Sequence, residues 1–191
     1  MPRNEGSNSA RQAPAAVAAI VNLLNSRPHS TAPTFPDTLQ TARTASDILR
    51  PFGQPEGLEP SPERIDAVRD LRTTLMDIVS APDSAQAAVG WTKLDERASS
   101  VTLRQDFSTP GTVRLLQVDG DPVVGAITLT VARLMTEGTW PRIRVCANDA
   151  CTRAFYDTTR SRTQRWHSYE MCGNKTNVAA YRARKKAAPE G

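Results

Sequence analysis

A chain of 191 residues fits one larger domain, or one ordinary domain with a small appendage, and it can bury a core without disulfide bonds. Three cysteines exclude a complete disulfide framework, and their confinement to residues 146–172 favours thiols kept reduced in a cytoplasm. The net charge of +4 is unevenly spread, because residues 142–186 hold 11 basic and 3 acidic side chains.

The N-terminal part predicts a polar tail and then a helix. Residues 1–12 are polar and rich in Gly, Ser and Asn, so we expect them to be disordered. The apolar run 15–24 predicts a helix from about Pro14 to Asn25, and the Asn22 within it argues against a signal peptide. No stretch reaches the roughly 20 apolar residues that span a bilayer, so we expect a soluble cytoplasmic protein.

Three further helices are predicted in residues 37–98, and proline-rich loops precede the first two of them. Asp37 followed by Gln40 is a capping-box pattern, and the helical apolar spacing after it stops at Pro51. Ser61 before a proline is a favourable start for the next helix. A fourth helix is expected from Pro82 or Asp83 to about Ala98, at some cost from Gly90.

After residue 100 the spacing of apolar residues changes from a helical to an extended pattern. Residues 101–107 and 113–118 alternate apolar and polar side chains around a Ser-Thr-Pro-Gly turn, which predicts a β-hairpin. Asp119 to Pro122 ends the hairpin and caps a helix that runs to about Gly138. The predicted fold is therefore mainly α with one β-hairpin, an α+β chain. We place a helical domain at residues 13–140 and a small separate module at residues 141–191.

A set of four soft ligands lies in the C-terminal segment. Cys146 with Cys151, and His167 with Cys172, form two pairs with four residues between the members of each pair. A tetrahedral zinc site takes four such ligands, usually as two close pairs. Gly173, directly after the last cysteine, would let the backbone fold tightly around the sulfur. We therefore expect one zinc ion, and chance placement of buried cysteines is the alternative.

The ligand count predicts a structural rather than a catalytic metal. Four protein ligands close the coordination shell, whereas a catalytic zinc keeps a position for water. Residues 141–191 contain few apolar side chains, so the metal should supply much of their folding free energy. We expect Asn174 to cap a short basic helix over residues 176–187.

Basic side chains around the ligands predict contact with nucleic acid. Such residues could grip phosphates, and the candidates are Arg160, Arg162, Arg165, Lys175, Arg182 and Arg184. The alternative is that the arginines pair with Asp149, Asp157 or solvent. For Trp166 we favour packing against the zinc site over contact with a base.

These residues together resemble the CGNR zinc-finger family. The resemblance lies in the Cys-x4-Cys pair, the segment from Phe155 to Arg162, and the Trp166-His-Ser-x-x-x-Cys-Gly-Asn-Lys run with its basic end. In the family motif the residue after the tryptophan is ordinarily cysteine and the last residue is arginine, whereas this chain has His167 and Lys175. Histidine is an accepted zinc ligand, and lysine keeps the charge without the bidentate fork of arginine.

The upstream part resembles the domain usually joined to this finger, a stress-induced transcription regulator domain. Its apolar run ending in asparagine is matched by residues 19–25, with Asn22 and Asn25. The resemblance implies bacterial DNA binding and transcriptional regulation, with an upstream part that senses an unknown ligand or mediates dimerisation, and a homodimer is open. A protein-interaction module without DNA binding is the alternative. We expect no enzyme and no catalytic residue, because His29 in a proline-rich loop is most simply exposed.

Overall fold

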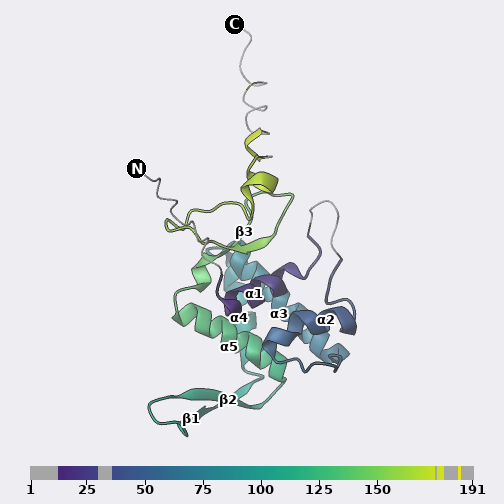
Figure 1. Ribbon diagram of the computed structural model, residues 1–191, viewed down its shortest axis with the longest axis vertical. Coiled ribbons are helices and arrows are strands. Elements are labelled where there is room, and N and C mark those ends of the chain that lie inside the picture. Colours follow the sequence, from purple (N-terminus) through teal and green to yellow (C-terminus); the bar gives the residue numbers. More distant parts are fainter. Residues whose placement is uncertain (1–12, 30–35, 175, 179–184, 186–191) are drawn as a thin grey trace, which may run out of the picture.

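The computed structural model describes residues 13–29, 36–174, 176–178 and 185. These residues form an α+β fold of five α-helices and two separate two-stranded antiparallel sheets (Figure 1). The helices are α1 (Ala15–Asn25), α2 (Ala42–Leu49), α3 (Pro62–Ser80), α4 (Ala85–Ala98) and α5 (Pro122–Thr136). The strands are β1 (Thr102–Asp106), β2 (Arg114–Asp119), β3 (Ile143–Val145) and β4 (Ala154–Tyr156). The predicted fold class is confirmed.

Side-chain caps explain where three of the helices begin. The hydroxyl of Ser61 accepts a hydrogen bond from the N–H of Arg64 at 3.3 Å, at the start of α3. Asp121 accepts from the N–H groups of Val123 and Val124, at 2.9 and 3.0 Å, and so caps α5. Both starts agree with the prediction. The cap of α4 is Ser84, slightly later than expected.

The predicted capping box before α2 is wrong. Thr41 caps this helix, because its hydroxyl accepts from the N–H of Thr44 at 3.3 Å. Asp37 instead accepts from the N–H of Leu39 at 2.9 Å and forms an ion pair with Arg72 of α3, with Nη2 and Oδ2 2.7 Å apart. The acidic side chain ties a loop to the core because a buried guanidinium needs a partner.

The helices pack around one main apolar core. Its fully buried large side chains come from several helices and include Ile20, Leu24, Leu71, Ile78 and Ile127. Gly90 allows α4 to approach α3 closely, since a Cβ at this position would lie 2.8 Å from Cγ1 of Ile78. Glycine has a low helix propensity, but the close packing of α4 against α3 requires it at position 90.

The hairpin β1–β2 lies at one end of the molecule and β3 at the other, with the helices between them (Figure 1). The predicted hairpin is confirmed, and its register places Asp106 opposite Arg114 and Leu103 opposite Gln117. No helix among the described residues is long and apolar enough to cross a membrane.

The sheet β3–β4 was not predicted. It pairs Ile143 with Tyr156 and Val145 with Ala154. Ile143 and Ala154 belong to the main core, so this small sheet packs against the helices. A second, smaller cluster contains Phe155, the three cysteines and Trp166. The division of the chain near residue 140 stays a prediction.

Candidate metal centre

Four potential metal ligands of the C-terminal module lie together. The ligand atoms of Cys146, Cys151, His167 and Cys172 all lie within 4.8 Å of one another. The first follows β3, the second lies in the turn before β4, and the last lies in the helical turn Tyr169–Gly173. The two pairs predicted from the spacing therefore converge on one point.

Backbone hydrogen bonds hold the first pair of cysteines. The N–H of Cys146 donates to the carbonyl of Arg153 at 2.8 Å, and the N–H of Cys151 donates to that of Asn148 at 2.7 Å. Thr152 has a positive φ of 53°, an unfavourable backbone conformation for a β-branched residue. The main chain of this turn thus positions both sulfur atoms.

A helical turn holds the last cysteine. The hydroxyl of Ser168 accepts from the N–H of Met171 at 3.2 Å, and the N–H of Cys172 donates to the carbonyl of Ser168 at 3.0 Å. Asn174 already has helical φ and ψ of −59° and −46°, and residues 176–178 are helical. Asn174 is therefore not the helix cap that we expected, because Ser168 caps the helix earlier in the chain.

The imidazole of His167 faces the sulfur atoms through Nδ1. This nitrogen is 3.4 Å from Sγ of Cys151 and 3.7 Å from Sγ of Cys172. With Zn–S of about 2.3 Å and Zn–N of about 2.0 Å, a tetrahedral site separates nitrogen and sulfur by about 3.5 Å. The observed distances fit a zinc ion with Nδ1 as its nitrogen ligand.

The other ring nitrogen of His167 points away from the sulfur atoms. Nε2 is buried and has no hydrogen-bond partner among the described residues. The ring borders a cavity of about 360 Å³ that Asn22 of α1 and Tyr156 of β4 also line. A zinc-binding histidine usually donates its second N–H to an outer group, and the described residues provide no such acceptor for Nε2.

Burial shifts the pKa values of two of the four ligands, Cys151 and His167. Burial raises the pKa of the Cys151 thiol to about 12, and the neighbouring thiols of Cys172 and Cys146 add to the increase. Burial also lowers the pKa of His167, so the imidazole stays neutral. Clustered thiolates are stable only beside a positive ion, and a neutral imidazole is the form that binds metal.

The coordination shell is complete within the chain. All three cysteines are buried, and four protein donors fill the positions of a tetrahedral ion, which leaves none for water. The arrangement therefore fits a structural zinc ion. When bound, the ion would link the turn before β4 to the helical turn that follows His167.

Sequence comparison identifies the segment that provides these ligands. Residues 142–185 match the family described as CGNR zinc finger. The C-terminal segment belongs to the CGNR zinc-finger family. No curated protein matches the chain. The matched residues include the whole ligand set, so the finger is a zinc-binding module with one structural site.

Two aromatic rings explain the glycine of the finger motif. A Cβ on Gly173 would lie 2.6 Å from the ring of Tyr169 and 3.1 Å from that of Trp166. The glycine is therefore required by close packing of these rings, rather than by a tight backbone around the sulfur. Trp166 packs against the ligand cluster, which is the role that we favoured for it.

A buried carboxylate organises the loop that follows β4. Asp157 accepts from the N–H of Thr159 at 2.9 Å, from the N–H of Gln164 at 3.0 Å and from Arg144 Nη1 at 3.4 Å. Burial alone would raise the pKa of Asp157, but the hydrogen bond from the Thr159 hydroxyl, together with those just named, outweighs burial and keeps that pKa below its usual value. Arg144 also donates to the carbonyl of Arg162 at 3.1 Å. The loop is thereby fixed at several points.

This loop presents the three described arginines of the predicted nucleic-acid set. Arg160, Arg162 and Arg165 are exposed, and none of them forms an ion pair with a described residue. Arg162 has a positive φ of 56°, and the guanidinium of Arg165 lies 5.2 Å from the centre of the Trp166 ring. Lys175, Arg182 and Arg184 lie outside the described residues.

Two residues at the end of α1 contact the finger and were not assigned this role from sequence. Asn25 hydrogen bonds to both backbone groups of Ala154, and Arg27 Nη2 donates to the carbonyl of Thr152 at 2.6 Å. The expectation that His29 is exposed is wrong, since only 7% of its surface is accessible.

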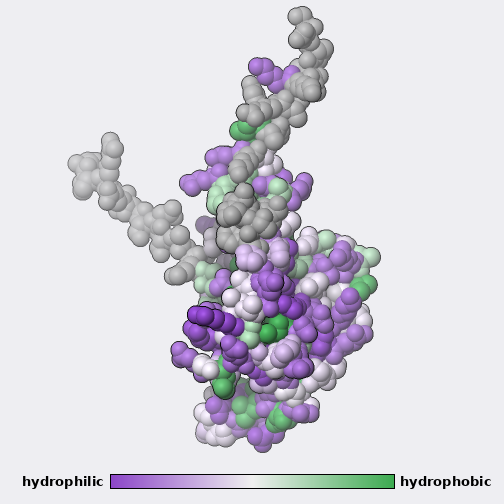
Figure 2. All heavy atoms as spheres, turned by 90° about the vertical axis from the view of Figure 1, so that its right-hand side faces the viewer, coloured by the Kyte–Doolittle hydropathy of each residue, from purple (hydrophilic) through white to green (hydrophobic). Residues whose placement is uncertain are grey.

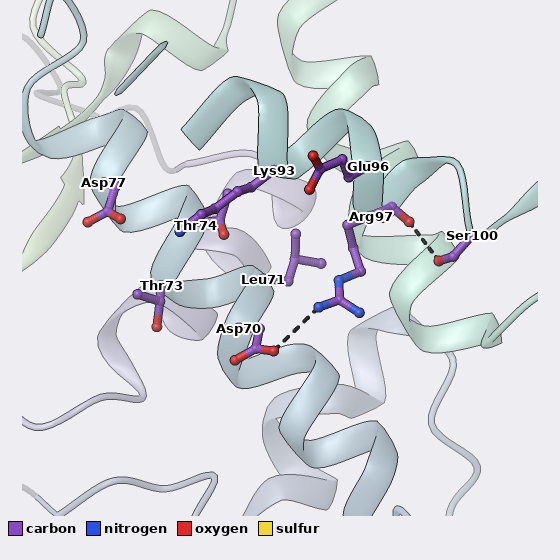
Figure 3. A pocket seen from close by; sticks show the side chains of 9 residues that line it. All are labelled: Asp70, Leu71, Thr73, Thr74, Asp77, Lys93, Glu96, Arg97 and Ser100. Carbon is purple, nitrogen blue, oxygen red and sulfur yellow. Dashed lines mark hydrogen bonds and ion pairs between the residues drawn. The ribbon is translucent and has the colours of Figure 1, made fainter. Parts of the chain in front are cut away.

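A polar groove of about 540 Å³ lies between α3 and α4, away from the finger (Figure 3). Both acidic and basic side chains line the groove, and Arg97 Nη2 lies 3.4 Å from Oδ2 of Asp70. Lys93 and Glu96 extend the mixture along α4. Since acidic and basic side chains share the groove, their fields largely cancel for an ionic ligand, and we assign it none.

Proposed function

We propose that this protein is a bacterial DNA-binding transcriptional regulator. In this proposal the zinc finger binds DNA through its basic residues, and the helical part upstream senses a ligand or mediates dimerisation. The cell compartment would be the cytoplasm, where the cysteines stay reduced for zinc. No catalytic residue is part of the proposal.

The observation that supports DNA binding is a rigid loop of exposed arginines without carboxylate partners. Arg160, Arg162 and Arg165 form no ion pair with any residue that the structure describes. The nearby carboxylate of Asp157 is occupied by backbone groups and by Arg144. Free guanidinium groups on a loop with a fixed backbone are suited to phosphate oxygens, which they bind through two hydrogen bonds.

The charge of the segment supports the same conclusion. Residues 142–186 contain 11 basic and 3 acidic side chains, and such a surplus attracts a polyanion over a distance. Lys175, Arg182 and Arg184 belong to the proposed interface because they continue the basic sequence in the C-terminal part of the finger. Arg165, stacked on Trp166, is restricted in its motion and so loses less entropy on binding phosphate.

Binding of duplex DNA should be measured as a function of salt. The change is paired neutralisation in the zinc-loaded protein, first Arg160→Gln with Arg162→Gln, then Arg182→Gln with Arg184→Gln. Each lost phosphate contact should reduce the slope of log K against log salt by about one unit. The matched control is Arg43→Gln with Lys93→Gln, two exposed cations of α2 and α4 that lie outside the finger.

The alternative function is a protein-interaction module. It would be favoured if the parent and the neutralised variants bound DNA equally weakly at physiological salt while zinc content stayed unchanged. It would also be favoured if the control pair reduced DNA binding as much as the loop pair, because the effect would then reflect total charge alone.

A further inference from the structure

The hairpin β1–β2 exposes an apolar face far from the zinc finger. Leu103 and Leu115 lie on the same face, because the register places Leu103 opposite Gln117 and side chains alternate along a strand. One residue beyond each paired strand, Phe107 and Val113 occupy the next positions of the same alternation, on either side of the turn. Their exposed fractions are 39% for Leu103, 51% for Leu115, 67% for Phe107 and 57% for Val113. Hydrophobic surface is visible at this end of the molecule in Figure 2.

This arrangement is unfavourable for an isolated chain in water. A two-stranded hairpin without further cover is only marginally stable, and four large apolar side chains on one of its faces gain nothing from solvent. The body of the protein supports the hairpin near its base, where Gln117 fits over Gly125 of α5: a Cβ there would meet its Oε1. The tip, with Phe107 and Val113, has no such support in the described chain.

The outer strand offers a free edge. In Figure 1, β2 lies toward the helices and β1 lies beyond it, at the lower limit of the molecule. Among the described residues the sheet contains only these two strands, so the outward backbone groups of β1 are unpaired within it. A free edge is a template for another strand, and its side chains decide which strand fits.

The side chains of β1 are complementary to a second copy of the same strand. Antiparallel pairing about a two-fold axis at Gln105 places Leu103 opposite Phe107 of the other copy on the apolar face. On the opposite face it places Arg104 opposite Asp106. The Asp106 carboxylate already accepts from Arg114 Nη2 at 2.9 Å, so the second copy would complete an Arg-Asp-Arg row across the strands.

The free edge of β2 does not show this complementarity. Pairing of two β2 strands about Leu116 would place Arg114 opposite Val118, and pairing about Gln117 would place Leu115 opposite Asp119. Both arrangements put a charge opposite an aliphatic side chain. We propose that β1 pairs with β1 of a second copy of this chain, in register about Gln105, to form a four-stranded antiparallel sheet.

The interface is small, so the dimer should depend on concentration. Stable interfaces usually bury about 1,200 Å² or more, and an edge pairing over residues 103–107 is shorter than such an interface requires. The Arg104–Asp106 rows should select the register and the apolar rows should provide most of the affinity. Sedimentation velocity of the zinc-loaded full chain should therefore show a shift from monomer toward dimer as concentration rises.

The register can be tested by a cysteine placed on the proposed two-fold axis. Residues directly opposite in an antiparallel pair have Cα atoms about 4.5 or 5.5 Å apart, within the range that a disulfide bridges. Gln105→Cys in the zinc-loaded full chain, incubated with glutathione disulfide, should therefore give a covalent dimer on a non-reducing gel. Gln105 is exposed, so the substitution should not affect folding.

The control is Thr112→Cys, an equally exposed thiol in the hairpin turn that lies away from the axis. The proposal holds if the Gln105→Cys chain crosslinks at least five times faster than Thr112→Cys, and if adding Arg104→Asp reduces that rate without changing the circular dichroism spectrum. Equal rates for the two cysteines, or no covalent dimer, would overturn it. DNA binding by the finger is measured separately, so either proposal can fail alone.

Discussion

Asn25 at the end of α1 binds both backbone groups of Ala154 in β4, although 129 residues separate them. Its Nδ2 donates to the carbonyl at 2.9 Å, and its Oδ1 accepts from the N–H at 2.8 Å. The side-chain amide thus pairs with the backbone of Ala154 as a neighbouring strand would. This contact connects α1 directly to the finger.

Asn25→Ala should destabilise the protein by about 1–3 kcal/mol, because two buried backbone groups of Ala154 lose their partners. The variant should also release zinc faster to a chelator, since β4 begins directly after the turn that holds Cys151. Urea unfolding and the release rate with a colorimetric chelator measure the two effects.

Asn22→Ala is the matched control for this substitution. It removes the same type of side chain from the same helix. Asn22 lines the cavity beside His167 but, unlike Asn25, forms no hydrogen bond with Ala154. If both variants released zinc at the same rate, the contact with Ala154 would not be the cause.

Removal of one ligand should separate the finger from the rest of the chain. The purified protein should contain about one zinc per chain, and Cys151→Ser should reduce this content and disorder residues 141–191. The upstream helices should keep their circular dichroism signal because the main core is largely their own. Elemental analysis that finds no metal in the reduced parent protein, purified without chelator, would contradict the prediction.

Substitution of His167 tests the fourth ligand. His167→Cys should keep or strengthen zinc binding, because the thiolate adds a negative charge to the site. His167→Ala should weaken zinc binding, since Nδ1 is the only ring atom facing Sγ of Cys151 and Cys172. Competition with a chelator of known affinity gives both constants. An alanine variant with unchanged affinity would mean that the fourth ligand lies elsewhere.

The sequence predicted those parts of the fold that depend on local patterns. The starts of α3 and α5 followed from Ser61 and Asp121, whose side chains bond neighbouring N–H groups. The ligand set followed from the spacing of cysteine and histidine, two residue types that bind zinc, in two pairs. Each of these features involves residues close together in the chain, so the amino-acid order contains the information.

The sequence did not predict features that depend on distant partners. Asp37 has the pattern of a helix cap, but its role is set by Arg72, which only the tertiary fold brings near. The docking role of Asn25 requires β4, and strands β3 and β4 are too short for alternation to be recognised.

The ion pair between Asp37 and Arg72 gives a pH dependence with a definite sign. The hydrogen bond from Arg72 holds the pKa of Asp37 below its usual value, with the N–H of Leu39 adding to the effect against the cost of burial. A carboxyl with a lowered pKa in the folded state stabilises the fold above its unfolded pKa of about 3.9. This stabilisation is lost as the pH falls through the lower, folded pKa.

Asp37→Asn should therefore reduce the free energy of unfolding by about 2 kcal/mol at pH 7, since the buried Arg72 loses its charged partner. The difference from the parent should shrink as the pH falls below about 4 and vanish below the folded pKa of Asp37. Urea unfolding of parent and variant at matched pH values measures it, and any acid release of zinc affects both proteins alike. Asp47→Asn, which removes an exposed ion pair with Arg50, should change stability little at any pH. A difference for Asp37→Asn that stayed constant down to pH 2 would mean that side-chain shape, rather than charge, is what Arg72 requires.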